Sequence, residues 1–138
     1  MPIDKSQQVA PYHEIPIPQS AKVFEQNGRD VYVRVRDPKN GVPPLIHQTV
    51  EKAHLLPRHI AAVVVHQGSL HMVEALEKQL PEYEGKFIHD YAQGNWSSGS
   101  ILKGLKKAID EGRVGKGDFV VMAGFGAGLF SATSVIQL

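Results

Sequence analysis

A continuous run of β-branched residues and alanines from Ile60 to Val65 limits the possible folds of this chain most strongly. A strand with one face in water alternates apolar and polar residues, whereas an unbroken apolar run is typical of a parallel strand that is covered on both faces. The run ends in His66 and Gln67. It therefore predicts a central strand in an α/β sheet, with polar side chains at its carboxyl end.

Helical and extended patterns alternate along the rest of the chain. Three helices are predicted, at residues 43–53, 69–80 and 98–111. Pro43 suits a first helical turn, Ser69 can cap a helix and Gly112 can close one. Three further strands are predicted, at residues 86–90, 119–123 and 129–136. This order predicts a mostly parallel sheet of five-stranded type, with one antiparallel strand and helices on both faces.

The helical spacing also predicts which side chains face the core. The residues expected to point inward are Leu70, Val73, Leu76 and Leu80 in the second helix, and Ile101, Leu105, Ala108 and Ile109 in the third. Lys103, Lys106 and Lys107 are expected to form a solvated face.

The N-terminal segment differs in composition from the rest of the chain. Four prolines in the first twenty residues predict an extended arm or linker over residues 1–22, followed by one domain over 23–138. The alternation of Val31, Val33 and Val35 favours a half-buried strand, and residues 37–41 predict a turn.

Composition excludes several classes of protein. The chain has 138 residues, of which 42% are hydrophobic, and this fits one ordinary domain. Its net charge of +1 creates no strong electrostatic field that would attract nucleic acid or an anionic membrane. No long apolar segment or basic leader is evident, so we expect a cytoplasmic protein. The chain contains no cysteine, and its seven histidines lack metal-site spacing. We expect neither a metal nor a cofactor.

Three polar or glycine-rich loops follow predicted strands, at residues 66–69, 93–95 and 124–128. In α/β sheets, functional groups gather at the carboxyl ends of the strands. Taken alone, His66 is more often a locally bonded histidine, and Asn95 before a helix is ordinary turn or cap chemistry. The segment Gly126-Ala127-Gly128 has no helix after it, which argues against a dinucleotide loop.

Four ordered motifs, at residues 64–70, 94–101, 111–118 and 123–129, resemble the C-terminal half of β-ketoacyl-acyl carrier protein (ACP) synthase III. This is a condensing enzyme of the thiolase superfamily. The resemblance covers Ile60 to Leu138 and extends to residues 42–56. It implies a five-layered αβαβα fold of two similar halves, in which the N-terminal half carries a nucleophilic cysteine.

The resemblance also implies roles for individual residues. His66 and Asn95 match the catalytic histidine and asparagine, which donate to a malonyl thioester oxygen during decarboxylative Claisen condensation. Six residues match the substrate-binding or active-site loops: Gln67, Gly68, Ser69, Gly126, Ala127 and Gly128.

Three features depart from the family pattern. Where relatives often carry Ala-Asn-Leu-Arg after the His-Gln pair, this chain has Gly68-Ser69-Leu70-His71, so His71 takes the place of a basic contact for carrier protein or CoA. Trp96 replaces a small residue. The family implies a helix over residues 31–42, where the valine alternation favours extended structure.

The largest departure is the missing cysteine-bearing half. Either a second polypeptide supplies it, or the sequence is a fragment of a longer enzyme. Since the sequence starts at Met1 without an obvious tag, we expect a hetero-oligomer with a Cys-bearing thiolase-like chain, inactive without it. Acyl carrier protein or CoA thioesters are the other expected partners. The alternative is a catalytically silent subunit that stabilises a related synthase or shapes its tunnel.

Overall fold

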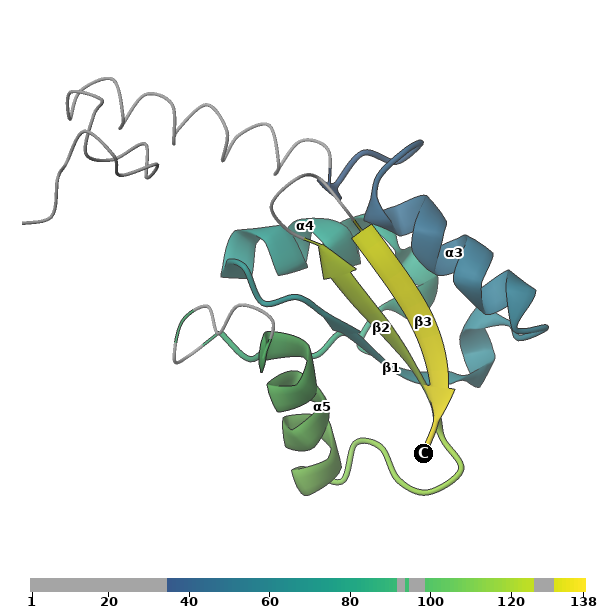
Figure 1. Ribbon diagram of the computed structural model, residues 1–138, viewed down its shortest axis with the longest axis vertical. Coiled ribbons are helices and arrows are strands. Elements are labelled where there is room, and N and C mark those ends of the chain that lie inside the picture. Colours follow the sequence, from purple (N-terminus) through teal and green to yellow (C-terminus); the bar gives the residue numbers. More distant parts are fainter. Residues whose placement is uncertain (1–34, 92–93, 95–98, 126–130) are drawn as a thin grey trace, which may run out of the picture.

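The computed structural model describes residues 35–91, 94, 99–125 and 131–138. Its sheet contains β1 (Ile60–Val65), β2 (Phe119–Phe125) and β3 (Ser131–Gln137), in the order β1-β2-β3. β1 and β2 are parallel, and β2 and β3 are antiparallel, as predicted (Figure 1). The predicted N-terminal arm and its boundary at residue 22 lie outside the described residues.

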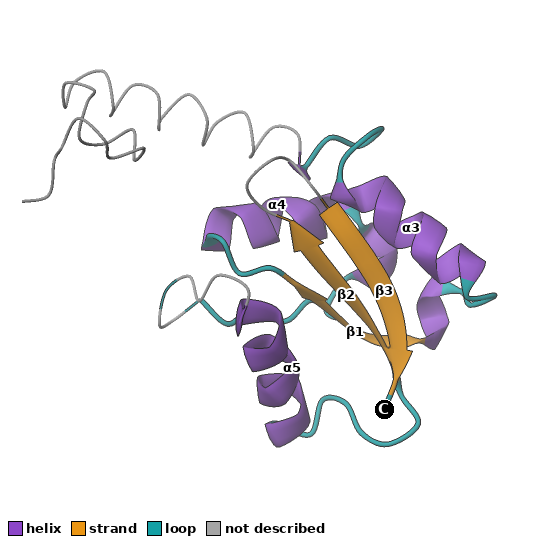
Figure 2. Cartoon of the chain, viewed as in Figure 1, coloured by secondary structure: helices purple, strands orange, loops and turns teal. Residues whose placement is uncertain are grey.

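Helices cover both faces of this sheet (Figure 2). The three α-helices are α3 (Val42–Lys52), α4 (Leu70–Gln79) and α5 (Ser100–Asp110). Short 3-10 turns span Pro57–His59 and Pro81–Tyr83. The α/β class is therefore confirmed. Among the described residues, no helix is long and apolar enough to cross a membrane.

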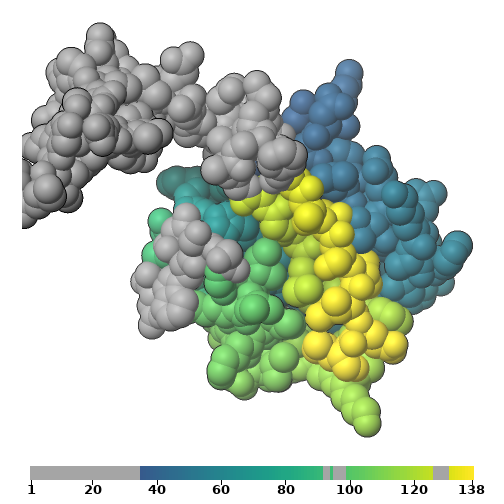
Figure 3. Space-filling view, viewed as in Figure 1, coloured from purple at the N-terminus to yellow at the C-terminus, as the bar shows by residue number. Residues whose placement is uncertain are grey.

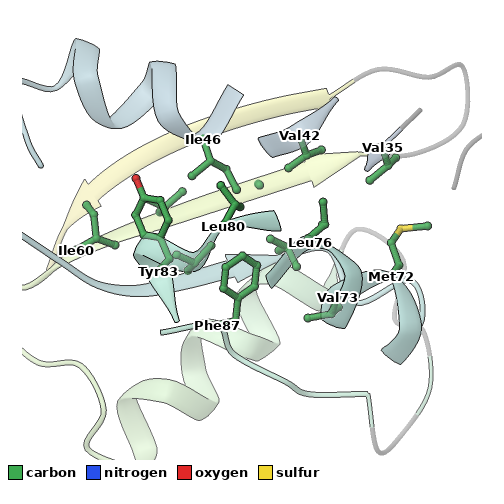
Figure 4. Close-up of a cluster of buried hydrophobic side chains, with 14 of the residues drawn as sticks. Val35, Val42, Ile46, Ile60, Met72, Val73, Leu76, Leu80, Tyr83 and Phe87 are labelled. Carbon is green, nitrogen blue, oxygen red and sulfur yellow. The ribbon is translucent and has the colours of Figure 1, made fainter. Parts of the chain in front are cut away.

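The buried core lies on both sides of β1. Val63 packs with Ile46 of α3 and Leu76 of α4 in the cluster drawn in Figure 4. The neighbouring Val64 points to the other face and belongs to a second cluster with Ala108 of α5. Both valines are fully buried, so the prediction of a strand covered on both faces is confirmed.

Two helix ends follow their local sequence signals. Ser69 caps α4 by accepting a hydrogen bond from the backbone N–H of Met72 at 3.2 Å. At the end of α5, Gly112 has a φ of 70°. Its N–H donates to the Ile109 carbonyl at 3.0 Å, and the next N–H, from Arg113, donates to Ala108 at 2.9 Å. Both predicted helix ends are confirmed.

The prediction of a strand over residues 86–90 is wrong. In this segment Phe87 makes a single bridge to Val63, and among the described residues the sheet has three strands rather than five. The backbone pairing stops because the Gln67 side chain takes the place of the next backbone partner, accepting from Asp90 N–H and donating to the Ile88 carbonyl.

Some predicted faces are also wrong. Leu70 is 43% exposed and Ile109 is 45% exposed, while Met72 is buried in α4. Val35 is buried and is the one valine of the predicted alternation that the structure describes, while residues 36–41 form turns rather than a continuous helix over 31–42, as the predicted turn at 37–41 requires. Two of the three lysines expected to face solvent, Lys103 and Lys107, instead make hydrogen bonds from α5 to Asp90 and to the His89 carbonyl.

Candidate functional site

His66 extends the carboxyl end of β1 by one residue. Its backbone N–H donates to the carbonyl of Ala123 in β2 at 2.9 Å, so the sheet fixes its main chain. The half-buried imidazole meets the Phe125 ring edge-on, with the ring centroids 5.3 Å apart and an interplanar angle of 88°. Adjacent strands of the sheet therefore place the histidine and hold its ring.

Ser100, the first residue of α5, contacts the His66 side chain. Its Oγ lies 2.8 Å from His66 Nδ1 and accepts the Gln67 backbone N–H at 3.2 Å. Ser100 is only 2% exposed. The helix on one face of the sheet thus reaches the strand end through a buried hydroxyl group.

Gly68 leaves space beside the other edge of the imidazole. A Cβ atom at this position would lie 3.3 Å from His66 Cδ2 and 3.4 Å from Nε2. These are tight contacts for a methyl group against a ring that Ser100 and Phe125 already hold. Gly68 therefore places no side chain of its own against the Nε2 edge.

Gln67 braces the same loop from inside the protein. Its side chain is 1% exposed. Nε2 donates to the carbonyls of Val65 at 2.8 Å and Ile88 at 3.1 Å, and Oε1 accepts the Asp90 N–H at 3.0 Å. Both polar groups of the amide are therefore bonded to the backbone. In this structure Gln67 holds β1 against the segment that follows Phe87.

Charged side chains fasten α5 to that segment. Lys103 Nζ lies 2.8 Å from Asp90 Oδ2, and both side chains are largely buried. Lys107 donates to the His89 carbonyl at 2.7 Å, and the His89 ring lies 2.7 Å from Glu77 of α4. The prediction of a purely solvated lysine face is therefore wrong for Lys103 and Lys107.

The predicted site residues are only partly described. Asn95, Gly126, Ala127 and Gly128 lie outside the described residues, and their roles stay predictions. His66, Gln67, Gly68 and the capping Ser69 follow one another after β1. Sequence reasoning missed Ser100 and Phe125, whose only local signals are their places at the start of a helix and at the end of a strand.

His71 lies on exposed helix surface. Its ring is 3.9 Å from Glu74 Oε2, with 88% of the side chain exposed. It borders an open cavity of about 660 Å³, which Arg36, Ser69 and Lys78 also line. No group of three or more potential metal ligands occurs in the described part of the chain.

Comparison with known proteins agrees with this arrangement of strands and helices. The sequence profile described as "3-Oxoacyl-[acyl-carrier-protein (ACP)] synthase III C terminal" matches residues 50–138. The chain is 35% identical over 117 residues to β-ketoacyl-ACP synthase III of Synechocystis sp., covering 84% of this chain and 34% of the relative. Against the enzyme of Gloeobacter violaceus it is 37% identical over 106 residues, covering 75% and 31%.

The crystal structure of the Thermus thermophilus synthase III superimposes with a TM-score of 0.73 at 34% identity, covering 81% of this chain and 34% of that one. The fold is thus that of one half of a thiolase-like protein. The chain belongs to the β-ketoacyl-ACP synthase III family and matches its C-terminal part. It spans about a third of the length of the curated relatives it matches.

Proposed function

We propose that this chain is the His/Asn-bearing half of a β-ketoacyl-ACP synthase III-like acyltransferase. The reaction is a decarboxylative Claisen condensation of an acyl thioester with malonyl-ACP or malonyl-CoA. The observation that carries the proposal is the placement of His66 at the carboxyl end of β1, with Nδ1 beside Ser100 and with Gly68, which has no side chain, next to the Nε2 edge. Membership of the family supports it.

The proposed chemistry needs a neutral donor at this position. A cysteine of the missing half attacks the acyl thioester, and the thiol carrier leaves. The malonyl thioester then loses carbon dioxide, and its electron pair moves toward the thioester oxygen. His66 and Asn95 donate hydrogen bonds to that oxygen. The carbanion then attacks the acyl carbon of the cysteine thioester, the bond from that carbon to sulfur breaks, and the cysteine thiolate leaves. Preorganised donors of this kind contribute on the order of 2.7 to 4 kcal/mol each.

The cysteine must come from outside this sequence, because none of its 138 residues is a cysteine. We propose that a Cys-bearing thiolase-like half covers the sheet face on which α5 lies. The strip of β3 beside α5 is open in the space-filling view (Figure 3). Register with β2 places the exposed Ala132 and Ser134 on this face, opposite Gly124 and Met122.

Apolar groups on α5 support the same partner. Leu102 is 67% exposed and Ile109 is 45% exposed. Fully burying a leucine or isoleucine side chain contributes about 1.5 to 3 kcal/mol, so two such residues provide a useful part of a binding energy. Thiolase-like halves bury a helical layer against each other, and α5 is the helix on the open side of this sheet.

A second contact is proposed for the thioester carrier. His71 shares its cavity with the basic side chains of Arg36 and Lys78, together with the acidic Glu74. We propose that Arg36 and Lys78 contact the phosphate of ACP-bound phosphopantetheine or of CoA.

Reconstitution with the missing half tests the catalytic role. The chain is purified from its native host, and mass spectrometry identifies the Cys-bearing protein that accompanies it. The two proteins are then combined, and malonyl decarboxylation and condensation are measured. His66→Ala and Asn95→Ala are each expected to lower decarboxylation by about a hundredfold or more. The matched control is His54→Asn, an exposed histidine with a φ of 56°, which asparagine tolerates.

The outcomes separate the enzyme from a silent subunit. Loss of decarboxylation in both site variants, with normal turnover in the His54 control, supports the enzyme. Undiminished turnover in both site variants refutes the catalytic role and leaves a binding subunit. A stable monomer that associates with no Cys-bearing chain refutes the split-enzyme proposal.

A further inference from the structure

We infer that Ser100 is a positioning residue that holds His66 in the tautomer with its proton on Nε2. A serine hydroxyl has one proton to donate and two lone pairs to accept. The Gln67 backbone N–H uses one lone pair, because an amide N–H can only donate. Among the described residues, the other partner of Ser100 Oγ is His66 Nδ1, at 2.8 Å.

Burial decides the direction of the bond between the serine and the histidine. Ser100 is 2% exposed, so water does not readily serve its hydroxyl proton. If Nδ1 carried the proton and donated to Oγ, the hydroxyl would accept twice, and its own proton would have no acceptor among the described residues. An unsatisfied buried donor costs about 1 to 3 kcal/mol. If the hydroxyl donates to Nδ1, both groups are satisfied, and the proton of the neutral imidazole lies on Nε2.

The surrounding contacts hold Ser100 in register with the histidine. Lys103, one turn further along α5, pairs with Asp90 at 2.8 Å. The Asp90 N–H donates to Gln67 Oε1 at 3.0 Å, and the Gln67 N–H returns to Ser100. The start of α5 is therefore attached to the loop after β1 directly through Ser100, and indirectly through Lys103, Asp90 and the Gln67 side chain. These contacts hold the hydroxyl group near Nδ1.

The catalytic consequence of this tautomer rests on the proposed function. The Nε2–H group lies on the ring edge beside Gly68, where a donor to a thioester oxygen is needed. The opposite tautomer would present a lone pair to that oxygen and repel it. Ser100 itself touches no reacting atom in this scheme, and it acts through His66.

Long-range ¹H–¹⁵N NMR of the full chain tests the inference without any turnover. This measurement distinguishes protonated from unprotonated ring nitrogens, and the His66 signals are identified as those lost in His66→Gln. The wild type is expected to show a protonated Nε2 and an unprotonated Nδ1. Ser100→Ala is expected to lose this preference, and Ser100→Thr, which keeps the hydroxyl, to retain it.

Two results would overturn the inference. One is a proton on Nδ1 in the wild-type chain, which needs no variant to fold. The other is an unchanged His66 tautomer in folded Ser100→Ala. In the reconstituted complex, we expect Ser100→Ala to lower kcat about ten- to a hundredfold with little change in KM, and Ser100→Thr to restore it. An inactive wild-type complex refutes the proposed function, while the tautomer still decides the role of Ser100.

Discussion

Replacing Gln67 by methionine tests whether the amide group, rather than side-chain volume, holds the loop after β1. Gln67 is 1% exposed and makes three hydrogen bonds to backbone groups, at 2.8, 3.1 and 3.0 Å. Methionine fills a similar volume and carries no amide. The Val65 and Ile88 carbonyls and the Asp90 N–H would each lose this partner in a site that water does not readily enter.

The size of the effect follows from these three bonds. A net contribution of about 1 kcal/mol for each bond gives about 3 kcal/mol of lost stability. Better burial of the thioether offsets part of this loss, and unsatisfied buried groups add to it, so we expect a decrease of about 2 to 4 kcal/mol in the free energy of unfolding. For a chain of this size, such a loss is a large fraction of the total stability.

Urea unfolding of the full chain, analysed by linear extrapolation, measures this loss. The matched control is Gln48→Met on the exposed side of α3, which should change stability by less than about 0.5 kcal/mol. Hydrogen exchange at the Asp90 amide should also become faster in Gln67→Met, because that amide loses its acceptor. A stability change as small as that of the Gln48 control would refute the conclusion that the Gln67 amide stabilises the loop after β1.

Three further variants test the packing and the open face. Gly104→Ala should lower Tm, because the new Cβ would lie 3.0 Å from Val64 Cγ1 in the core. Overpacking costs about 1 to 3 kcal/mol, which outweighs the gain of about 1 kcal/mol in helix propensity. A higher Tm would contradict this reasoning. Burial raises the pKa of Tyr83 above its ordinary value of 10.0, so the stability from its neutral phenol is complete below pH 10.0 and is lost as pH rises through the raised pKa. Tyr83→Phe should remove that loss in urea titrations at alkaline pH, and an unchanged pH dependence would argue against it. Leu102→Ala combined with Ile109→Ala should leave the urea midpoint of the chain nearly unchanged, because both side chains are exposed. The double variant should weaken binding to the Cys-bearing half by about tenfold or more. Unchanged affinity would exclude the α5 face as the interface.

Local patterns predict the parts of this fold that depend on local physics. The apolar run from Ile60 to Val65 identifies a strand buried on both faces, because only such a strand tolerates apolar side chains in both directions. Ser69 and Gly112 mark helix ends because each satisfies backbone groups within a few residues. The family resemblance rests on ordered motifs of the same local kind.

The details that sequence reasoning missed depend on contacts between distant residues. Ser100 meets His66 across 34 positions, and no local pattern indicates that contact. The strand predicted after Lys86 fails because a side chain, Gln67, takes hydrogen bonds that a backbone neighbour would otherwise make. Helical spacing identifies the apolar stripe that includes Ile109, but the width of the covered stripe depends on what lies opposite the helix.

A serine hydroxyl 2.8 Å from a histidine nitrogen also resembles a nucleophile beside its general base. The surroundings argue for the opposite assignment. A nucleophilic oxygen must be open to its substrate, whereas Ser100 is 2% exposed and already accepts the Gln67 N–H. Its hydroxyl proton is used to hold the imidazole and is not removed by it. The Ser100–His66 pair therefore supplies an oriented hydrogen-bond donor but no site for an acyl group. Because the sequence has no cysteine, the proposed condensation requires the second half to carry the acyl group.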